Sequence, residues 1–181
     1  MVSRIWNESE ILVDRKSKFQ ARCCQLSSEA EIPGILRDLV DDNKSIQKAS
    51  HMHMYAWRTG ELVSGVGTNV GIVKGKVGGK HKAKAKAKTK TKTKTKAETV
   101  TDGTKLGSFK QVVKNLRQGS ADCGEAGAGQ RLLTLLERTN VVNVLLIVTR
   151  WHGGIPLGSA RFRHISFVAM ESLKRGHFLQ N

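Results

Sequence analysis

The sequence has few cysteines and no long apolar run, and each absence argues against a class of protein. Its three cysteines are an odd number, and Cys23 and Cys24 are adjacent, which disfavours a disulfide between them. No CxxC pair is present, which argues against a zinc ribbon. The longest apolar run lies near Val141–Val148 and is far shorter than a membrane span. The residues Met1–Lys16 contain no apolar stretch of signal-peptide length. We therefore expect a soluble cytoplasmic protein, or a nuclear one, with reduced thiols and without a bound metal or cofactor.

Acidic residues are absent from one tract, and this tract explains most of the net charge. The chain has 31 Lys and Arg against 15 Asp and Glu, which gives a formal net charge of +16. Eleven of the lysines lie between Lys74 and Lys96, where there is no acidic residue, and this leaves 20 basic residues against 15 acidic ones elsewhere. The rest of the chain is thus only mildly basic, and the overall charge does not by itself predict nucleic-acid binding.

The same tract predicts an insert in the domain. Over 82–96 lysine alternates with alanine and then threonine. Every second side chain is therefore charged, and none of the others is large and apolar. Such a segment cannot bury enough surface to offset its ordering entropy, and we predict a Gly/Lys-rich disordered insert over 59–105. It can act as an electrostatic arm for RNA, DNA, ribosomes or anionic lipid, or as a nuclear-localisation patch, or it can be dispensable. The lysines of this arm are Lys82, Lys84, Lys86, Lys88, Lys90, Lys92, Lys94 and Lys96.

Hydrophobic periodicity predicts the elements on both sides of the insert. Two segments read as strands because apolar residues recur at short spacing around a polar turn, and the run of Val, Leu and Ile after residue 141 indicates a strand covered on both faces. Other segments repeat apolar residues at helical spacing. We predict strands 5–15 and 18–26, helix 29–42, strand 51–58, a short helix near 109–116, helix 130–139, strand 141–150 and helix 159–175. This order, strands first and then helix–strand–helix, predicts an α/β (α+β) two-layer sandwich formed as one domain by 1–58 and 106–181.

A glycine-rich turn, Gly153–Gly158, follows the apolar strand and leads into the last predicted helix. Glycines permit a tight turn, and a helix N-terminus offers free N–H groups to an anion. The turn can therefore be an anion or polyanion site, or only a tight turn beneath a packed Trp151. A nucleotide-hydrolysis loop is disfavoured because Ser159-Ala160 stands where Lys-Ser/Thr is required. The candidate binding surface comprises Arg150, Trp151, His152, Gly153, Gly154, Gly158, Arg161, Arg163 and His164.

A second glycine-rich turn contains Asp122, Gly124 and Glu125. Two carboxylates at this spacing can act as acid and base or hold Mg²⁺, but acidic residues before a helix more often cap its free N–H groups. Cys123 between them would need a base to act as a nucleophile, and His152 is one possible partner.

Two histidines form a further candidate site. His51 and His53 alternate in the predicted strand with Tyr55 and Trp57, which places the four side chains on one face. Two histidines on one face can reach one metal ion, but no third ligand is identifiable. We assign no metal site and no catalytic residue. An enzyme that uses Asp122, Glu125 and His152 on a phosphorylated or acyl substrate is the least favoured alternative.

Four segments, in order along the chain, resemble the IMPACT family, also called the YigZ or UPF0029 family. They are DRKSKFQARCCQL at 14–26, KASHMHMYAWR at 48–58, DCGEAGAGQRLLTLLE at 122–137 and NVLLIVTRWHGGIPLGSARFRHI at 143–165. The last segment looks most like eukaryotic members, which usually read RWYGGI and RFKHI. His152 replaces the usual tyrosine, and Cys123 stands where an acidic residue is common.

The resemblance implies a fold similar to domain 2 of ribosomal protein S5 and a role in translational control. Eukaryotic relatives bind the large ribosome-associated activator of the starvation-responsive initiation-factor kinase and so restrain that kinase, whereas nucleic-acid binding has been proposed for bacterial relatives. An N-terminal RWD domain is not expected, because the resemblance begins near Asp14. We therefore expect a non-enzymatic regulatory or binding protein whose partner belongs to the translation-control machinery. RNA or ribosome binding is the alternative, and no membrane partner is expected.

Overall fold

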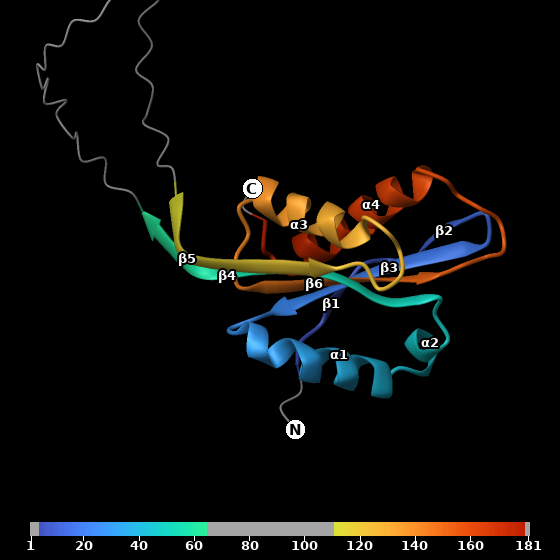
Figure 1. The fold of residues 1–181 in the computed structure, drawn as a ribbon, viewed down its shortest axis with the longest axis horizontal. Coiled ribbons are helices and arrows are strands. Elements are labelled where there is room, and N and C mark those ends of the chain that lie inside the picture. Colours follow the sequence, from blue (N-terminus) through green and yellow to red (C-terminus); the bar gives the residue numbers. More distant parts are fainter. Residues whose placement is uncertain (1–3, 65–110, 180–181) are drawn as a thin grey trace, which may run out of the picture. The chain divides into compact units, whose positions relative to one another are not determined.

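A six-stranded sheet runs through the part of the chain that the computed structural model describes, residues 4–64 and 111–179 (Figure 1). The strand order is β1-β3-β6-β4-β5, and β2 also pairs with β3. Both neighbours of β6, the strands β3 and β4, are antiparallel to it. The strands are β1 (Asn7–Glu8), β2 (Leu12–Asp14), β3 (Ser17–Gln25), β4 (His51–Ser64), β5 (Gln111–Ala121) and β6 (Val144–Trp151). The helices are η1 (Glu29–Glu31), α1 (Ile32–Asp41), α2 (Lys44–Gln47), α3 (Ala128–Arg138) and α4 (Ala160–Arg175).

Strand β6 is the buried centre of the sheet, as the sequence predicts. Its residues from Val144 to Arg150 are all buried. Alternate side chains point to opposite faces of a strand, so Leu146 and Val148 enter one hydrophobic core and Leu145 and Ile147 enter another. Because both faces of the strand are buried, residues pointing to either face are apolar, and the sequence of β6 is a nearly continuous apolar run.

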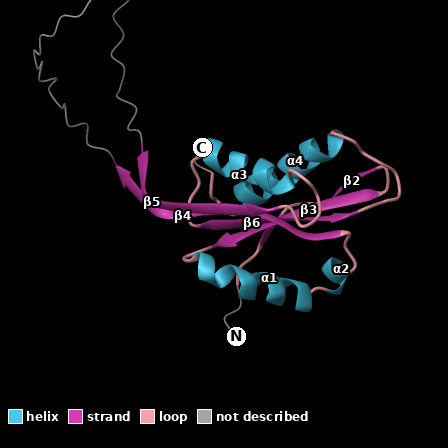
Figure 2. Ribbon diagram, in the orientation of Figure 1, coloured by secondary structure: helices cyan, strands magenta, loops and turns pink. Residues whose placement is uncertain are grey.

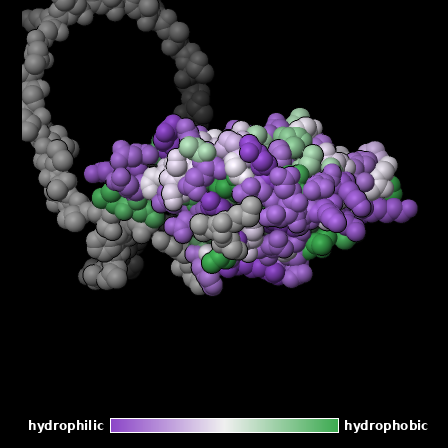
Figure 3. All heavy atoms as spheres, turned by 90° about the horizontal axis from the view of Figure 1, so that it is seen from below, coloured by the Kyte–Doolittle hydropathy of each residue, from purple (hydrophilic) through white to green (hydrophobic). Residues whose placement is uncertain are grey.

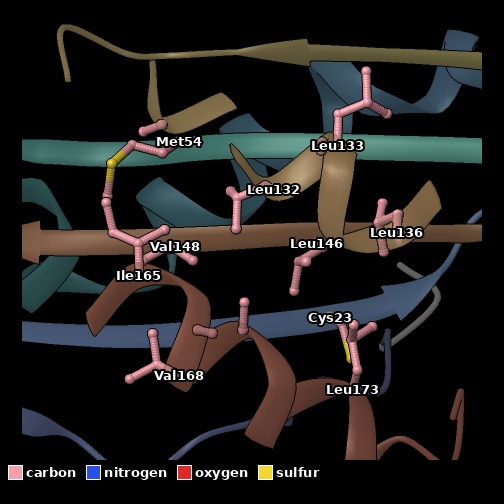
Figure 4. Close-up of a cluster of buried hydrophobic side chains, with 14 of the residues drawn as sticks. Cys23, Met54, Leu132, Leu133, Leu136, Leu146, Val148, Ile165, Val168 and Leu173 are labelled. Atoms are coloured by element: carbon pink, nitrogen blue, oxygen red, sulfur yellow. The ribbon is translucent and has the colours of Figure 1, made fainter. Parts of the chain in front are cut away.

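Helices cover both faces of the sheet, so the prediction of two layers is wrong (Figures 1 and 2). The core on one face contains Leu132 and Leu136 from α3 with Ile165 and Leu173 from α4 (Figure 4). The core on the other face contains the apolar side of α1 together with Ile46 of α2. The sheet is therefore the middle of three layers, because β6 offers an apolar surface on each side. The α+β class and the helix–strand–helix order of the C-terminal half are confirmed, and the likeness to domain 2 of ribosomal protein S5 stays a prediction.

Three predicted elements differ from the structure. The strand predicted over 5–15 is divided into β1 and β2, and residues 111–116 of the helix predicted near 109–116 belong to β5. Short apolar clusters fit either period, and Val112 and Leu116 are in fact exposed on β5. The predicted insert begins too early, since Thr59–Ser64 belongs to β4. The arm Lys82–Lys96 lies outside the described residues.

The cysteines are free thiols in this structure. Cys23 and Cys24 are buried on opposite faces of β3, and burial raises the pKa of each thiol to about 11. Both therefore remain protonated and unreactive at neutral pH. Within the described residues no helix is long and apolar enough to span a membrane.

Candidate functional site

Glu125 lies at the centre of a buried ionic cluster that it forms with Arg150, Arg161 and His51. Arg150 donates a hydrogen bond to Oε2 of Glu125, and Nε of Arg161 lies 2.6 Å from Oε1. The Arg161 contact is an ion pair without hydrogen-bond geometry. Nε2 of His51 lies 3.4 Å from Oε2. Only 7% of the Glu125 side chain and 5% of the Arg150 side chain are exposed. The Glu125 carboxylate was a candidate for chemistry and the Arg150 guanidinium a candidate for binding. In this cluster the two groups are paired with each other.

A β-bulge brings His51 into the ionic cluster. His51 pairs with Arg150 and Met54 with Val148, so three steps on β4 match two on β6. The extra residue reverses the alternation, and His53 lies beside Tyr55 with ring centroids 6.5 Å apart. The prediction that His51 and His53 share one face is therefore wrong. Among the described residues no group of three His, Cys, Asp or Glu side chains could hold a metal ion.

Asp122 caps helix α3. Its carboxylate accepts hydrogen bonds from the backbone N–H groups of Gly127, at 3.0 Å, and Gly129, at 2.7 Å. These donors are among those that a helix leaves unsatisfied at its N-terminus. The capping interpretation is thus confirmed for Asp122, whereas Glu125 makes ion pairs instead. The two carboxylates serve different structural tasks and do not form an acid–base pair.

Replacing Asp122 with alanine is expected to lower the free energy of unfolding by about 1–2 kcal/mol, because two N–H groups at the start of α3 lose their acceptor. Urea unfolding measures the change. Asp122→Asn is the matched control, since it keeps one acceptor oxygen and is expected to lose about half as much. An alanine variant as stable as the wild type would contradict the capping role.

The glycine turn Gly153–Gly158 is held against the turn between β2 and β3. The N–H of Gly153 donates to Oγ of Ser17 at 3.0 Å, and the N–H of His152 donates to Oγ of Ser50 at 2.9 Å. The N–H of Gly154 donates to Nδ1 of His152 at 2.9 Å. These three donors have partners within the chain, which favours the tight-turn interpretation over an anion site at the turn itself.

The structure does not gather the nine predicted surface residues on one surface. Arg150 and Arg161 point to Glu125, whereas Trp151 packs on the opposite face of the sheet and donates its indole N–H to the carbonyl of Ser45 at 2.8 Å. His164 lies 2.8 Å from a carboxylate oxygen of Asp14. The exposed members of the set are His152, Gly154, Gly158 and Arg163.

The least favoured alternative, an enzyme site around the glycine turns, needs Asp122, Glu125 and His152 to act together. Each has a different partner in the structure: the α3 cap, the ionic cluster and the N–H of Gly154. His51, and not His152, approaches the Cys123 loop, with Nδ1 lying 3.0 Å from the Cys123 carbonyl. The described residues thus do not bring this predicted set together.

Two hollows are lined by residues that the sequence did not predict as site residues, apart from Trp151. A groove of about 520 Å³ between α3 and α4 is lined by Arg131, Arg138 and Phe162, among others. A cavity of about 340 Å³ on the α1–α2 side is lined by Trp151 and by basic residues of the β2–β3 turn and of β3. The sequence carried a signal for the second one. Polar side chains recur at every second position in Lys18, Gln20 and Arg22, between buried apolar residues, which indicates a polar stripe on one strand face.

Fold and site together define an α+β domain whose buried charged groups hold its loops and helix ends in place. The sequence profile of the Impact N-terminal domain matches residues 15–173. The chain therefore belongs to the IMPACT family, as its four segments indicate.

Individual relatives agree with this assignment. The chain is 56% identical over 179 residues to IMPACT family member YDL177C of Saccharomyces cerevisiae, covering 97% of this chain and 94% of that protein. It is 29% identical over 168 residues to the Protein IMPACT homolog of Schizosaccharomyces pombe, covering 93% of this chain but only 41% of the relative. The chain thus spans nearly all of YDL177C and less than half of the S. pombe protein.

Two solved structures are similar. A crystal structure of a hypothetical protein aligns with a TM-score of 0.51 at 16% identity, covering 99% of this chain and 63% of that one, and shows the same fold. The two-domain translational regulator Yih1 is 28% identical with a TM-score of 0.46, covering 94% of this chain and 46% of that one.

Proposed function

We propose that this chain is a non-enzymatic regulatory protein of translational control. The observation that carries the proposal is the family match over residues 15–173, which takes in nearly all of the four segments that resemble the IMPACT family. The described polar clusters support a binding role, because Asp122 and Glu125 serve the fold and leave no free carboxylate at the glycine turns. The partner is a protein of the translation-control machinery, in the first place the ribosome-associated activator of the starvation-responsive kinase, and the site of action is the cytoplasm.

The groove between α3 and α4 is the surface that best suits a protein partner. Arg131 and Arg138 are both exposed and lie seven residues apart on α3, so both face the groove. The guanidinium groups of Arg131 and Arg161 lie 5.6 and 4.3 Å from the ring centre of Phe162. Arginine and aromatic side chains contribute most of the binding energy in many interfaces. A segment of the partner with acidic residues complements this groove.

Affinity purification of the tagged full chain from a cell extract at low salt tests the proposal. We expect ribosomes or translation factors, including the kinase activator, to be captured. Arg131→Ala with Arg138→Ala is expected to reduce capture of the direct partner about tenfold or more, because an arginine that anchors an interface costs more than about 1 kcal/mol when it is truncated. The matched control is Lys114→Ala with Lys174→Ala, two exposed residues that do not line the groove and remove the same charge. Absence of all translation components from the wild-type capture would contradict the proposal.

A second candidate function, RNA or ribosome binding through the electrostatic arm, rests on the eleven lysines between Lys74 and Lys96. The same purification distinguishes it. If the arm binds RNA, deleting 74–96 removes ribosomes from the capture, and raising the salt concentration has the same effect on the wild type, because such binding depends on counterion release. If the groove binds a protein partner, capture of that partner survives the deletion.

A further inference from the structure

A cavity of about 340 Å³ opens on the α1–α2 side of the sheet, beside the end of β6. This face of the molecule is predominantly hydrophilic (Figure 3). The volume lies at the lower end of the range for small-molecule sites, roughly 300–1,000 Å³. The lining combines three basic residues with an aromatic one and with polar groups beside α2: Lys16, Lys18, Arg22, Trp151, Asn43 and Ser45.

Arg22 lines this cavity and has a buried nitrogen without a hydrogen-bond partner among the described residues. The residue is 4% exposed, its Nε donates to Glu8 at 2.7 Å, and one terminal nitrogen donates to Gln20 at 2.6 Å. The other terminal nitrogen, Nη1, is buried and has no hydrogen-bond acceptor among the described residues. Buried polar atoms are nearly always satisfied, so the Arg22 side chain, which lines the cavity, retains a donor that lacks an acceptor.

The charge of the cavity favours a dianion. Lys16 and Lys18 are exposed and make no ion pair with any residue in the described ranges. Among the described residues, Glu8 pairs with Arg22 and neutralises one of these three charges. Two positive charges remain, which matches a phosphate monoester at neutral pH, since its second pKa is about 6. Guanidinium groups bind phosphate oxygens with suitable geometry.

Trp151 supplies an aromatic wall to the same cavity. Its indole N–H donates to the Ser45 carbonyl at 2.8 Å, so the ring is held in one orientation while it remains partly exposed. The exposed Ile11 lines the cavity as well. A fixed aromatic ring beside cationic groups is the arrangement that holds a nucleobase next to its phosphate.

We infer that this cavity binds a nucleoside 5′-phosphate unit, with the phosphate at Lys16, Lys18 and Arg22 and the base against Trp151. A free mononucleotide and a nucleotide of single-stranded RNA share this chemistry. The inference is independent of the protein partner proposed for the α3–α4 groove. It deepens the RNA-binding candidate, because it places nucleotide recognition in the folded domain and not in the lysine tract.

Titration of the full chain with AMP, at about 0.15 M salt to screen the lysine tract, tests the inference. Binding is measured by calorimetry and by the indole N–H resonance of Trp151 in NMR spectra, identified by its loss in Trp151→Phe. We expect AMP to shift that resonance and to bind about tenfold or more tightly than inorganic phosphate or adenosine alone. Lys16→Ala with Lys18→Ala is expected to weaken AMP binding about tenfold or more. Lys114→Ala with Lys174→Ala, which removes the same charge elsewhere, is expected to leave the affinity within about twofold of the wild type.

A 5′-phosphorylated single-stranded RNA of five adenosines distinguishes the two sources. If it shifts the Trp151 resonance and AMP displaces it, the cavity recognises RNA. If AMP alone shifts the resonance, the ligand is a free nucleotide. The inference is overturned if no probe shifts Trp151, or if both double variants lose AMP affinity equally, since diffuse charge would then explain the binding. Neither result depends on whether translation components are captured in the purification described above.

Discussion

Replacing Glu125 with alanine is expected to lower the free energy of unfolding by about 3–5 kcal/mol, because it leaves the buried guanidinium of Arg150 without its counter-ion. Arg161 and His51 lose the same partner, although both are more exposed to water. The change also releases the loop before α3 from the end of β6 and the first turn of α4. Urea unfolding at neutral pH, followed by circular dichroism, measures the loss.

Two further variants separate charge from packing at this position. Glu137→Ala removes an exposed carboxylate of α3 whose contact is with Gln118, and it is expected to cost less than about 1 kcal/mol. Arg150→Met added to Glu125→Gln removes both buried charges, and it is expected to recover part of the stability that Glu125→Gln alone loses. A Glu125→Ala protein within about 1 kcal/mol of the wild type would show that the ionic cluster does not hold these elements together.

Gly153→Ala is expected to cost about 3 kcal/mol or more, because a Cβ at this position would lie 2.2 Å from the carbonyl carbon of Lys16 and 2.5 Å from the nitrogen of Ser17. Both are backbone atoms, so no side chain can move aside. The turn that would have to move already holds Arg15 and Lys16 at positive φ, 46° and 64°. The substitution thus drives the β6–α4 loop away from the β2–β3 turn, and thermal unfolding is expected to show the loss directly.

The neighbouring glycine provides the control for this prediction. Gly154 has a φ of 85°, which strains an alanine, but a Cβ there would meet nothing within 4 Å. Gly154→Ala is therefore expected to cost only about 1 kcal/mol. If Gly154→Ala proved more damaging than Gly153→Ala, backbone conformation and not the close approach of the two turns would limit this part of the fold.

Some of this fold could be predicted from the sequence because the signal is local. Strand β6 has a nearly continuous run of branched apolar residues, and α3 and α4 repeat theirs at helical spacing. The cluster Val112, Val113 and Leu116 fits a helix as well as a strand, and only its pairing in the sheet makes it β5. The number of layers was hidden for a similar reason, since no local pattern says to which face of β6 each helix packs.

The candidate site was harder to predict, because its contacts join distant segments. Local reasoning correctly identified Asp122 as a helix cap. It suggested the same role for Glu125, but the ion-pair partners of Glu125 lie at least 25 residues further along the chain or on β4. The bulge in β4 places His51 on the opposite face from the one expected, and the alternation of residues in the sequence does not indicate an extra residue. The polar stripe from Lys18 to Arg22 was visible in the sequence, but its cavity exists only where β6 and the start of α2 meet β3.

The central place of β6 also sets when this domain can fold during synthesis. Strands β3 and β4 each pair with β6 and not with one another, and both hydrophobic cores contain side chains of β6. A nascent chain that ends before Val144 therefore has β1 to β5 but can complete neither core. Its apolar faces stay open to chaperones or to aggregation until the central strand leaves the ribosomal exit tunnel. Assembly of the sheet is thus a late, non-local event, and the residues 65–110 between β4 and β5 lengthen the stretch of chain that must be made before it can occur.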